Sequence, residues 1–281
     1  MSKVTPNGKV YLVGAGPGAA DLITVRGAKL LAQADIVFHD ALIESEMLAL
    51  CPQAIKVAVG KRCGKLSSAQ YFINKRLVDA AKQYKTVVRL KGGDPMLFGR
   101  ADEELQALKN QGIEVEVVPG ITAALAGAAS LQQSLTLRGV SRSVAFVTLA
   151  QAIENPDGND KQPIPNPSAD TLVYYMGRKD ARQIAKQLIE TSPNHTSKTP
   201  VHILESVSTP RERHWSSTLE ELAKGAADQW FDSTSPALIM IGEALQKKST
   251  VEVRECLQGL GTEINNSLQN SQIFPNGRRR A

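Results

Sequence analysis

The feature that most constrains the fold is a regular alternation of short apolar runs and amphipathic segments along the first 120 residues. Short apolar runs are typical of buried strands, and the segments between them carry apolar residues at helical spacing. Strands that alternate with helices favour a mostly parallel sheet covered on both faces. The expected strands are 9–13, 35–38, 54–59, 86–90 and 114–118, and the expected helices are 22–34, 44–50, 69–84 and 101–110.

A looser alternation follows residue 121. Residues 121–131 are rich in small side chains and predict a closely packed helix at a domain junction, and residues 155–168, with four prolines, predict a surface loop. We therefore expect an N-terminal α/β domain over 1–121, a C-terminal α/β domain over 122–246, and a partly disordered extension over 247–281. The further expected elements are strands at 144–148, 171–176, 201–205 and 237–241 and a helix at 181–190.

Two of the expected strands end in glycine-rich turns. Residues 10–13 precede the turn Gly14–Gly18 (GAGPG), and residues 87–90 precede Lys91–Pro95 (KGGDP). Glycines let the backbone approach a ligand closely and present its N–H groups. Because ligands of open α/β sheets bind at the carboxyl ends of the strands, both turns are predicted to contact one small molecule.

The first turn formally matches a dinucleotide-binding fingerprint from Gly14 to Ala19, with Asp35 or Asp40 about twenty residues further on. Pro17 argues against this interpretation, because proline removes an N–H from the arc that would surround a pyrophosphate. No Gly-Lys-Ser/Thr follows, which excludes a P-loop. An NAD-dependent oxidoreductase is therefore a minor alternative, and a ligand-binding turn that holds no phosphate is favoured over a purely structural turn.

Charged residues end neighbouring expected strands. Asp40 follows one strand, and Lys61 follows the next after a single glycine. Each could be an ordinary solvated loop charge, but near two glycine turns they offer a carboxylate base and an ammonium group. Asp94 lies between Gly93 and Pro95, where it either caps the turn or accepts a hydrogen bond from the ligand.

Composition and spacing narrow the function classes. The four histidines and three cysteines show no metal-ligand spacing, so no metal site and no disulfide framework is expected. A net charge of +5 favours an anionic ligand, whereas an aromatic content of 5% argues against nucleic acid. The apolar runs are far shorter than the roughly 20 residues of a membrane span, and the first residues hold no apolar leader. We expect a cytoplasmic location and no membrane partner.

Several segments together resemble the uroporphyrinogen-III C-methyltransferases of the tetrapyrrole methylase family. The likeness runs in order from about residue 8 to residue 245, and its segments are Val13–Gly18, Ala34–Asp40, Val59–Arg62, Val88–Arg100, Val118–Ala124, Tyr175–Gly177 and Ser235–Ile239. The resemblance implies a two-domain α/β tetrapyrrole methylase fold with mixed, mostly parallel sheets, a cofactor cleft between the domains, and a homodimer. Sirohaem synthases carry an additional dehydrogenase–ferrochelatase region, which we do not expect in this chain.

The resemblance also implies the reaction and its residues. The reaction is methylation of uroporphyrinogen III at C2 and C7 to precorrin-2, with S-adenosyl-L-methionine as methyl donor and S-adenosyl-L-homocysteine as product. Asp40 corresponds to the proton acceptor and Lys61 to the proton donor. The implied cofactor contacts are Pro17, Gly92, Asp94, Leu97, Thr122, Ala123, Met176 and Val207, and basic residues suited to the substrate carboxylates are Arg62, Arg89, Arg100 and Arg138.

The chain departs from the family pattern at several positions. Val207 stands where the family has glycine, and Ala41, Leu137 and Ala150 replace polar or charged residues on the substrate side. Methylation of uroporphyrinogen III stays the leading prediction, and these changes leave two alternatives to it open. The chain either methylates another precorrin, or it is a catalytically weakened homologue that binds the tetrapyrrole or the cofactor.

Overall fold

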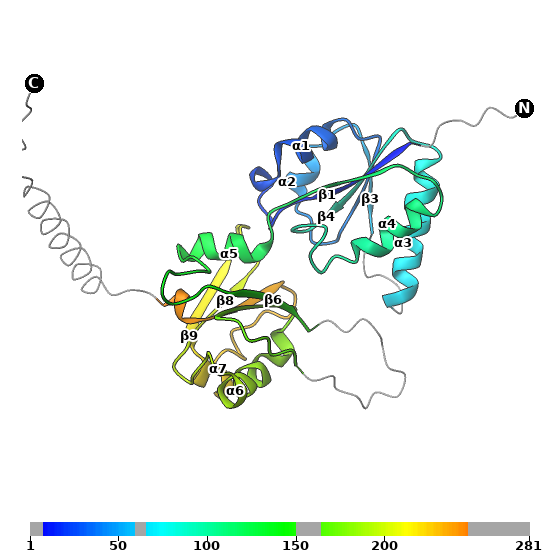
Figure 1. Ribbon diagram of the computed structural model, residues 1–281. Helices are drawn as coiled ribbons and strands as arrows, with labels where there is room; N and C mark the ends of the chain where they lie inside the picture. Colours follow the sequence, from blue (N-terminus) through cyan, green and yellow to red (C-terminus); the bar gives the residue numbers. More distant parts are fainter. Residues whose placement is uncertain (1–7, 60–65, 150–163, 247–281) are drawn as a thin grey trace, which may run out of the picture. The chain divides into compact units, whose positions relative to one another are not determined.

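The computed structural model describes residues 8–59, 66–149 and 164–246, and the two sheets that it contains lie in one compact unit ending at Leu245 (Figure 1). The predicted extension over 247–281, most of the predicted loop over 155–168, and Lys61 and Arg62 lie outside the described residues. Within these ranges no helix has the length and apolar character that a membrane crossing requires.

The first sheet is entirely parallel, as the alternating pattern predicts. Its strand order is β3-β2-β4-β1-β5, so β1 and β4, which carry the two glycine turns, are neighbours in the middle of the sheet. The strands are β1 (Lys9–Gly14), β2 (Ile36–His39), β3 (Ile55–Ala58), β4 (Thr86–Lys91) and β5 (Val115–Val118). All four pairings place their carboxyl ends at the same edge.

Helices cover both faces of this sheet (Figure 1). Alternation along β1 directs Val10 and Leu12 to one face, where they join the core beneath two of the helices, and Val13 to the other. The first face meets α3 (Leu66–Ala81) and α4 (Ala101–Lys109), and the second meets α1 (Val25–Ala32) and α2 (Ser45–Ala49). A 3₁₀ turn, η1 (Ala20–Leu22), replaces the first turn of the expected helix 22–34, and α1 begins after Thr24, whose side chain accepts a hydrogen bond from the Gly27 N–H at 3.1 Å.

The second sheet is mixed. Its order is β6-β7-β10-β8-β9, in which β6 and β7 are parallel and the other three pairings are antiparallel. The strands are β6 (Val144–Thr148), β7 (Thr171–Tyr175), β8 (Pro200–Glu205), β9 (Arg213–Thr218) and β10 (Ala237–Ile241). The two sheets together are mixed and mostly parallel, as the resemblance implies.

Sequence patterns missed β9 and the short helix that follows it, α7 (Leu219–Lys224). The strand has the sequence RHWSST and lies at the edge of the sheet, mostly or partly exposed, so it lacks the apolar run that marks a buried strand. The helix has six residues, fewer than two turns, which is too short for a clear helical period.

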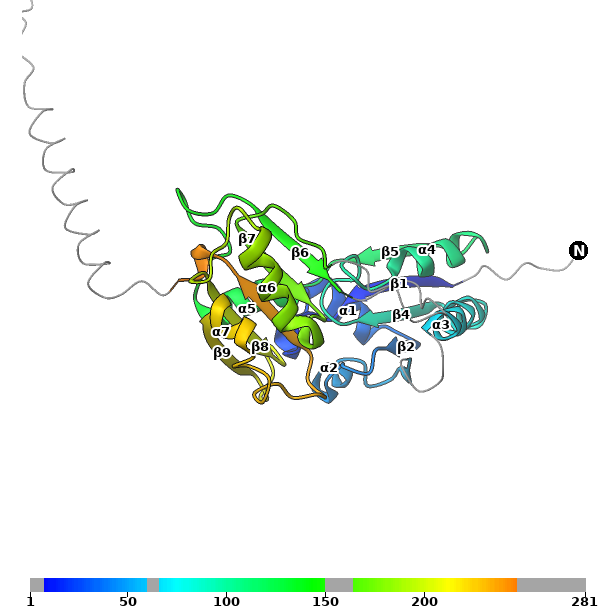
Figure 2. The ribbon, with the colours of Figure 1, turned by 90° about the horizontal axis from the view of Figure 1, so that it is seen from below.

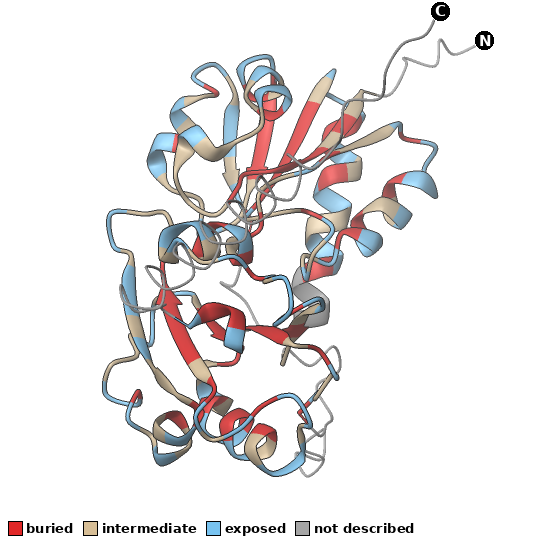
Figure 3. Cartoon of the chain, turned by 60° about the vertical axis from the view of Figure 1, so that its left-hand side comes forward, coloured by how far each residue is buried: buried red, intermediate tan, exposed pale blue. Residues whose placement is uncertain are grey.

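Helices also cover both faces of the second sheet (Figure 2). One face packs on α6 (Ala181–Thr191) and α7, and the other packs on α5 (Ala123–Leu131), the helix of small side chains. A Cβ on Gly127 of α5 would lie 3.2 Å from the Met240 sulfur, so the small residues let this helix approach the sheet closely. Buried residues follow the strands and the inward helix faces, and exposed residues lie on the outer surfaces and loops (Figure 3).

Candidate functional site

The two glycine turns lie against each other at the carboxyl edge of the first sheet. Gly16 and Gly93 form an antiparallel bridge, in which the Gly93 N–H donates to the Gly16 carbonyl at 2.7 Å and the reverse bond measures 3.2 Å. Gly120, which follows β5, joins them, since a Cβ there would lie only 2.3 Å from the Gly93 carbonyl oxygen. The predicted convergence of the strand ends is therefore a close backbone contact that side chains would prevent.

A large cleft opens beside these turns, with a volume of about 1150 Å³. It is lined from the first sheet by the loops after β1, β2 and β4, and from the second part of the chain by loops after β7 and β8 and before β10. All eight residues that the sequence predicts as cofactor contacts lie in this lining: Pro17, Gly92, Asp94, Leu97, Thr122, Ala123, Met176 and Val207.

Gly92 is the position where the backbone is most open to a ligand. A Cβ built on Gly92 would meet no atom within 4 Å, so the space beside this residue along the cleft wall is free for a ligand. Several non-glycine residues of the lining adopt left-handed backbone conformations, namely Phe98 (φ 53°), Met176 (φ 57°) and Ser206 (φ 50°). Such conformations are costly for residues with a Cβ, and they gather at functional sites.

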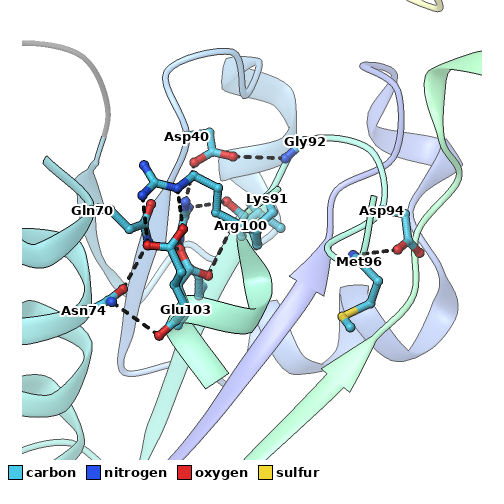
Figure 4. Close-up of polar contacts among 12 residues, drawn as sticks. Asp40, Gln70, Asn74, Lys91, Gly92, Asp94, Met96, Arg100 and Glu103 are labelled. Carbon is cyan, nitrogen blue, oxygen red and sulfur yellow. Dashed lines mark hydrogen bonds and ion pairs between the residues drawn. The ribbon is translucent and has the colours of Figure 1, made fainter. Parts of the chain in front are cut away.

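Asp94 ties the turns together. Its Oδ1 accepts a hydrogen bond from the Met96 N–H at 2.8 Å (Figure 4). Its Oδ2 accepts one from the Gly120 N–H, also at 2.8 Å. The first bond is the turn cap that the sequence leaves open as an alternative, and the second crosses to the turn after β5. Asp94 therefore shapes the cleft wall through both carboxylate oxygens.

Asp40 follows β2 and lies in the cleft lining with its side chain about one-third exposed. Its Oδ1 accepts from Arg89 Nη2 at 2.5 Å, and its Oδ2 accepts from the Gly92 N–H at 3.3 Å (Figure 4). The other acidic candidate, Asp35, lies at the opposite edge of the sheet and accepts from the backbone N–H groups of Lys85 and Thr86. Of these two carboxylates, Asp40 alone lies in the cleft lining.

Arg89 does not lie on an open rim, as the sequence analysis expects of a substrate-binding arginine. It is 3% exposed and donates to Glu104 Oε1 at 3.0 Å as well as to Asp40. The reason is its place on β4, a strand inside the sheet, where a charged side chain is tolerated only when paired. Burial, the largest influence, lowers the pKa of Arg89, but the charges of Asp40 and Glu104 outweigh it and raise that pKa overall.

Glu104 is a site residue that the sequence analysis missed. It is fully buried, and its Oε2 accepts from Lys91 Nζ at 3.1 Å. The sequence signal that could have revealed Glu104 is its spacing in α4, because it shares the inward face of the helix with Ala101 and Leu108. The other acidic residues of the first turn, Asp102 and Glu103, are exposed. Lys91, which also lines the cleft, has its pKa lowered by burial first and by the neighbouring Arg89 charge second.

Arg100 and Arg138, the other predicted substrate arginines among the described residues, are not part of the cleft lining. Both are exposed; Arg100 pairs with Glu103 through Nε at 2.6 Å, and Arg138 lies in the segment between α5 and β6. Four basic residues that were not predicted from the sequence do line the cleft, all from the second part of the chain: Arg178, Lys179, Arg211 and Arg213. Arg178 directly follows the Tyr-Met-Gly segment, which is the one signal that points to it.

Tyr175 connects several walls of the cleft. Its hydroxyl lies 2.6 Å from Thr122 Oγ1 and accepts from the Ala124 N–H at 3.1 Å, which satisfies a free donor at the start of α5. Its ring meets the ring of Phe98 edge-on, with centroids 5.2 Å apart. Burial raises the pKa of Tyr175 and favours the neutral hydroxyl.

The departures from the family pattern fall in different places. Ala41 lies in the cleft lining next to Asp40. Leu137 bridges to Ser141 in the segment before β6, and Ala150 lies outside the described residues. Val207 is buried in the lining between two left-handed residues, Ser206 and Ser208.

Comparison with known proteins relates this geometry to a family. The family model for Tetrapyrrole (Corrin/Porphyrin) Methylases matches residues 9–223. A uroporphyrinogen-III C-methyltransferase of Pseudomonas aeruginosa is 41% identical over 237 residues, which are 84% of this chain and 94% of that protein. A siroheme synthase of Psychrobacter sp. (strain PRwf-1) is also 41% identical, over 84% of this chain and 47% of its own length.

Solved structures agree with the sequence matches. The uroporphyrin-III C-methyltransferase of Thermus thermophilus, complexed with S-adenosyl homocysteine, is 36% identical with a TM-score of 0.70, covering 87% of this chain and 98% of that one. A cobalt precorrin-4 methyltransferase gives the same TM-score at 27% identity, covering 85% and 96%. The chain spans about half the length of the siroheme synthases that it matches. It belongs to the tetrapyrrole (corrin/porphyrin) methylase family.

Proposed function

We propose that this chain transfers methyl groups from S-adenosyl-L-methionine to C2 and C7 of uroporphyrinogen III. The product is precorrin-2, formed through precorrin-1, and it feeds sirohaem or cobalamin synthesis. The observation that carries the proposal is that all eight predicted cofactor contacts and Asp40 line one cleft. The Pseudomonas aeruginosa relative of that name, matched over nearly its whole length, supports it.

The cleft fits two ligands. Its volume of about 1150 Å³ exceeds the roughly 300–1,000 Å³ of a typical small-molecule pocket, so a methyl donor and part of a macrocycle have room together. S-adenosyl-L-methionine supplies an electrophilic methyl group on a sulfonium. The open space at Gly92 and the loop at Met176 offer backbone groups to hold it, which aligns the methyl with the acceptor carbon.

Asp40 is suited to the proton step. When the new C–C bond forms, the C–S bond breaks and its electron pair stays on sulfur, leaving S-adenosyl-L-homocysteine and a positively charged macrocycle. A proton must then leave the macrocycle, and the Asp40 carboxylate can both stabilise the charge and accept the proton. Lys61, which lies outside the described residues, stays the predicted proton donor.

The polycarboxylate substrate calls for cations around the cleft. Lys179 and Arg211 are exposed residues of the lining that can meet substrate carboxylates, and Arg211 also pairs with Glu44. Arg62, Arg100 and Arg138 stay predicted substrate contacts. Arg89 is assigned instead to Asp40, because it is buried in the ion pair.

A second candidate function is methylation of another precorrin, or binding without efficient catalysis. The likeness to a cobalt precorrin-4 methyltransferase favours the first of these, and the replacements at Ala41, Leu137 and Ala150 favour the second. An NAD-dependent oxidoreductase is not supported. The turn that contains Pro17 is packed against Gly93, and Pro17 has no backbone N–H to donate to a pyrophosphate.

We further propose a cytoplasmic homodimer whose cleft lies between an N-terminal domain over 1–121 and a C-terminal domain over 122–246. The first sheet lies wholly within the former range and the second within the latter, which supports this division. An open hollow that includes the exposed Leu125 of α5 and Phe146 of β6 is a candidate contact between copies. Sedimentation equilibrium of the purified protein tests the dimer.

Anaerobic incubation of the purified protein with uroporphyrinogen III and methyl-labelled S-adenosyl-L-methionine tests the function. Transfer of two labelled methyl groups per macrocycle is the expected result. Tight binding of S-adenosyl-L-homocysteine without methyl transfer would favour a homologue that only binds its ligands. If methyl transfer occurs only when another precorrin replaces uroporphyrinogen III in the incubation, the chain is a methylase of that precorrin.

Replacement of Asp40 by asparagine tests the proposed base. Asp40→Asn keeps an oxygen for Arg89 but removes the carboxylate that accepts the proton, so kcat should fall by about 10²–10⁴-fold. The Kd for S-adenosyl-L-homocysteine, measured by calorimetry, should stay near the wild-type value. An asparagine variant with normal turnover would contradict the role.

A further inference from the structure

The strongest unassigned feature of the described chain is the carboxylate of Glu104, which is fully buried next to the cleft wall. It accepts from Arg89 Nε at 3.0 Å, from Lys91 Nζ at 3.1 Å and from Gln70 Nε2 at 3.3 Å. The acceptor comes from α4, the two cations come from β4, and the amide comes from α3. Two elements, β4 and α3, thus direct three donors at a carboxylate on a third, which stabilises a charge that would otherwise be costly to bury.

The contact with Glu104 determines how the guanidinium of Arg89 is oriented. Arg89 donates through Nε to Glu104, through Nη1 to the Leu90 carbonyl at 3.1 Å, and through Nη2 to Asp40 at 2.5 Å. Because each nitrogen has its own acceptor and the group is planar, the guanidinium cannot turn without losing at least one bond. The position of the Asp40 carboxylate therefore depends on Glu104.

The charges of this group balance. Two buried cations, Arg89 and Lys91, face one buried anion, Glu104, and the partly exposed Asp40 supplies the second anion. Without the Glu104 charge, both cations would compete for Asp40 and repel each other. Figure 4 labels Asp40, Gln70 and Lys91, three of the residues that surround Arg89 and Glu104.

We propose that Glu104 is a positioning residue, which holds Arg89 so that Arg89 in turn holds the Asp40 carboxylate in the cleft. The inference rests on the proposed function, because that function makes Asp40 the proton acceptor. Glu104 touches neither ligand in this account and acts only through the ion pair.

Glu104→Gln is the sharpest test. It keeps the size of the side chain but replaces one oxygen by an NH₂ group, which then faces a donor, either Arg89 Nε or Lys91 Nζ. We expect kcat for methyl transfer to fall at least about tenfold, because a displaced base loses part of its usual 10²–10⁴-fold contribution. The Kd for S-adenosyl-L-homocysteine should stay within about twofold, and Glu104→Asp, which restores the charge, should recover part of kcat.

Asp35→Asn is the matched control. Asp35 is a structural carboxylate of the same sheet, but it binds the backbone N–H groups of Lys85 and Thr86 at the opposite edge. Its loss should lower the Tm without changing kcat. If Glu104→Gln leaves kcat unchanged, or lowers kcat and cofactor affinity together, Glu104 is merely structural and the inference is wrong.

Two further measurements extend the test, and the second of them needs no activity. If Glu104→Gln folds poorly, Arg89→Lys by itself keeps the inference testable, because it should lower kcat and leave the Kd for S-adenosyl-L-homocysteine unchanged, and an unchanged kcat would overturn the inference. Arg89→Lys keeps the charge but cannot bridge Glu104 and Asp40. If both residues act through the same ion pair, the double variant Arg89→Lys/Glu104→Gln should have a kcat no lower than that of the slower single variant. Additive losses in kcat would overturn the inference. A crystal structure of Glu104→Gln should show the contact between Arg89 Nη2 and Asp40 Oδ1 lost, and an intact contact would overturn it. A wild-type protein that transfers no methyl group would contradict the proposed function alone, since the crystal structure still decides the role of Glu104.

Discussion

At the scale of the residue, two adjacent tyrosines on β7 show how position decides a role. Tyr174 is fully buried among the core side chains beneath α6, and its hydroxyl donates to the Pro165 carbonyl at 3.1 Å. Tyr175 points to the other face and reaches the start of α5, where Thr122 and Ala124 are its partners. Alternation along the strand thus makes one tyrosine a core residue and the other a part of the cleft.

Phenylalanine at each position separates the two roles. Tyr175→Phe removes the acceptor of the Ala124 N–H, and at about 1 kcal/mol per hydrogen bond it should raise the Kd for S-adenosyl-L-homocysteine by about fivefold. Tyr174→Phe should lower thermal stability by a similar free energy and leave that Kd unchanged. Calorimetric titration and thermal unfolding of both variants check this, and equal Kd values in the two would contradict the role of Tyr175.

At the scale of the element, the carboxyl edge of the first sheet works because its glycines serve two separate purposes. Gly14 and Gly120 let neighbouring turns approach, with a virtual Cβ of Gly14 only 2.6 Å from Gly120 Cα. Gly92 instead borders open space in the cleft. Packing of the turns therefore requires glycine at positions 14 and 120, and access for a ligand requires glycine at position 92.

Alanine substitutions distinguish these purposes. Gly120→Ala places a methyl group 2.3 Å from the Gly93 carbonyl oxygen, so it should reduce the free energy of unfolding by about 1–3 kcal/mol. Gly92→Ala should leave that free energy within about 0.5 kcal/mol of wild type, because nothing opposes its Cβ. It should nevertheless weaken S-adenosyl-L-homocysteine binding at least about tenfold, or about 1.4 kcal/mol. Urea unfolding and titration calorimetry measure the two effects, and a Gly92→Ala variant with normal affinity would place the ligand elsewhere.

At the scale of the whole described unit, a few contacts join the loops of the first sheet to those of the second across the cleft. The Ala19 N–H donates to Ser208 Oγ at 3.1 Å, and Arg211 pairs with Glu44 at 2.5 Å. Both residues of the ion pair line the cleft. These contacts connect the two sides of the site, so we expect them to influence ligand release.

Charge reversal across the cleft tests this expectation. Arg211→Glu should speed release of S-adenosyl-L-homocysteine by about two- to fivefold, because an exposed ion pair contributes at most about 1 kcal/mol. The exchange of both charges, Glu44→Arg with Arg211→Glu, should restore the rate, and 1 M salt should remove the difference. Lys224→Glu, which disrupts an exposed pair on α7, is the control and should change nothing. Release rates come from stopped-flow displacement, and a rate unchanged by Arg211→Glu would exclude a role for the pair.

The amino-acid sequence by itself determined most of the elements and the edge of the first sheet where the site lies. Apolar runs mark the central strands β1 and β4, and glycine spacing marks the turns that meet at Gly16 and Gly93. These signals are local, since periodicity and backbone freedom belong to a few consecutive residues. Half of the eight predicted cofactor contacts, Pro17, Gly92, Asp94 and Leu97, lie in or next to those turns, and the other four come from the segments after β5, β7 and β8.

Only the tertiary structure decided which charges face one another. Arg89 reads as a surface cation in the sequence, yet it is buried between Asp40 and Glu104, which come from two different elements. The basic lining from Arg178 to Arg213 and the edge strand β9 were likewise invisible to local patterns. The physical reason is that a buried charge depends on partners distant in sequence, and their proximity is set by the packing of whole elements.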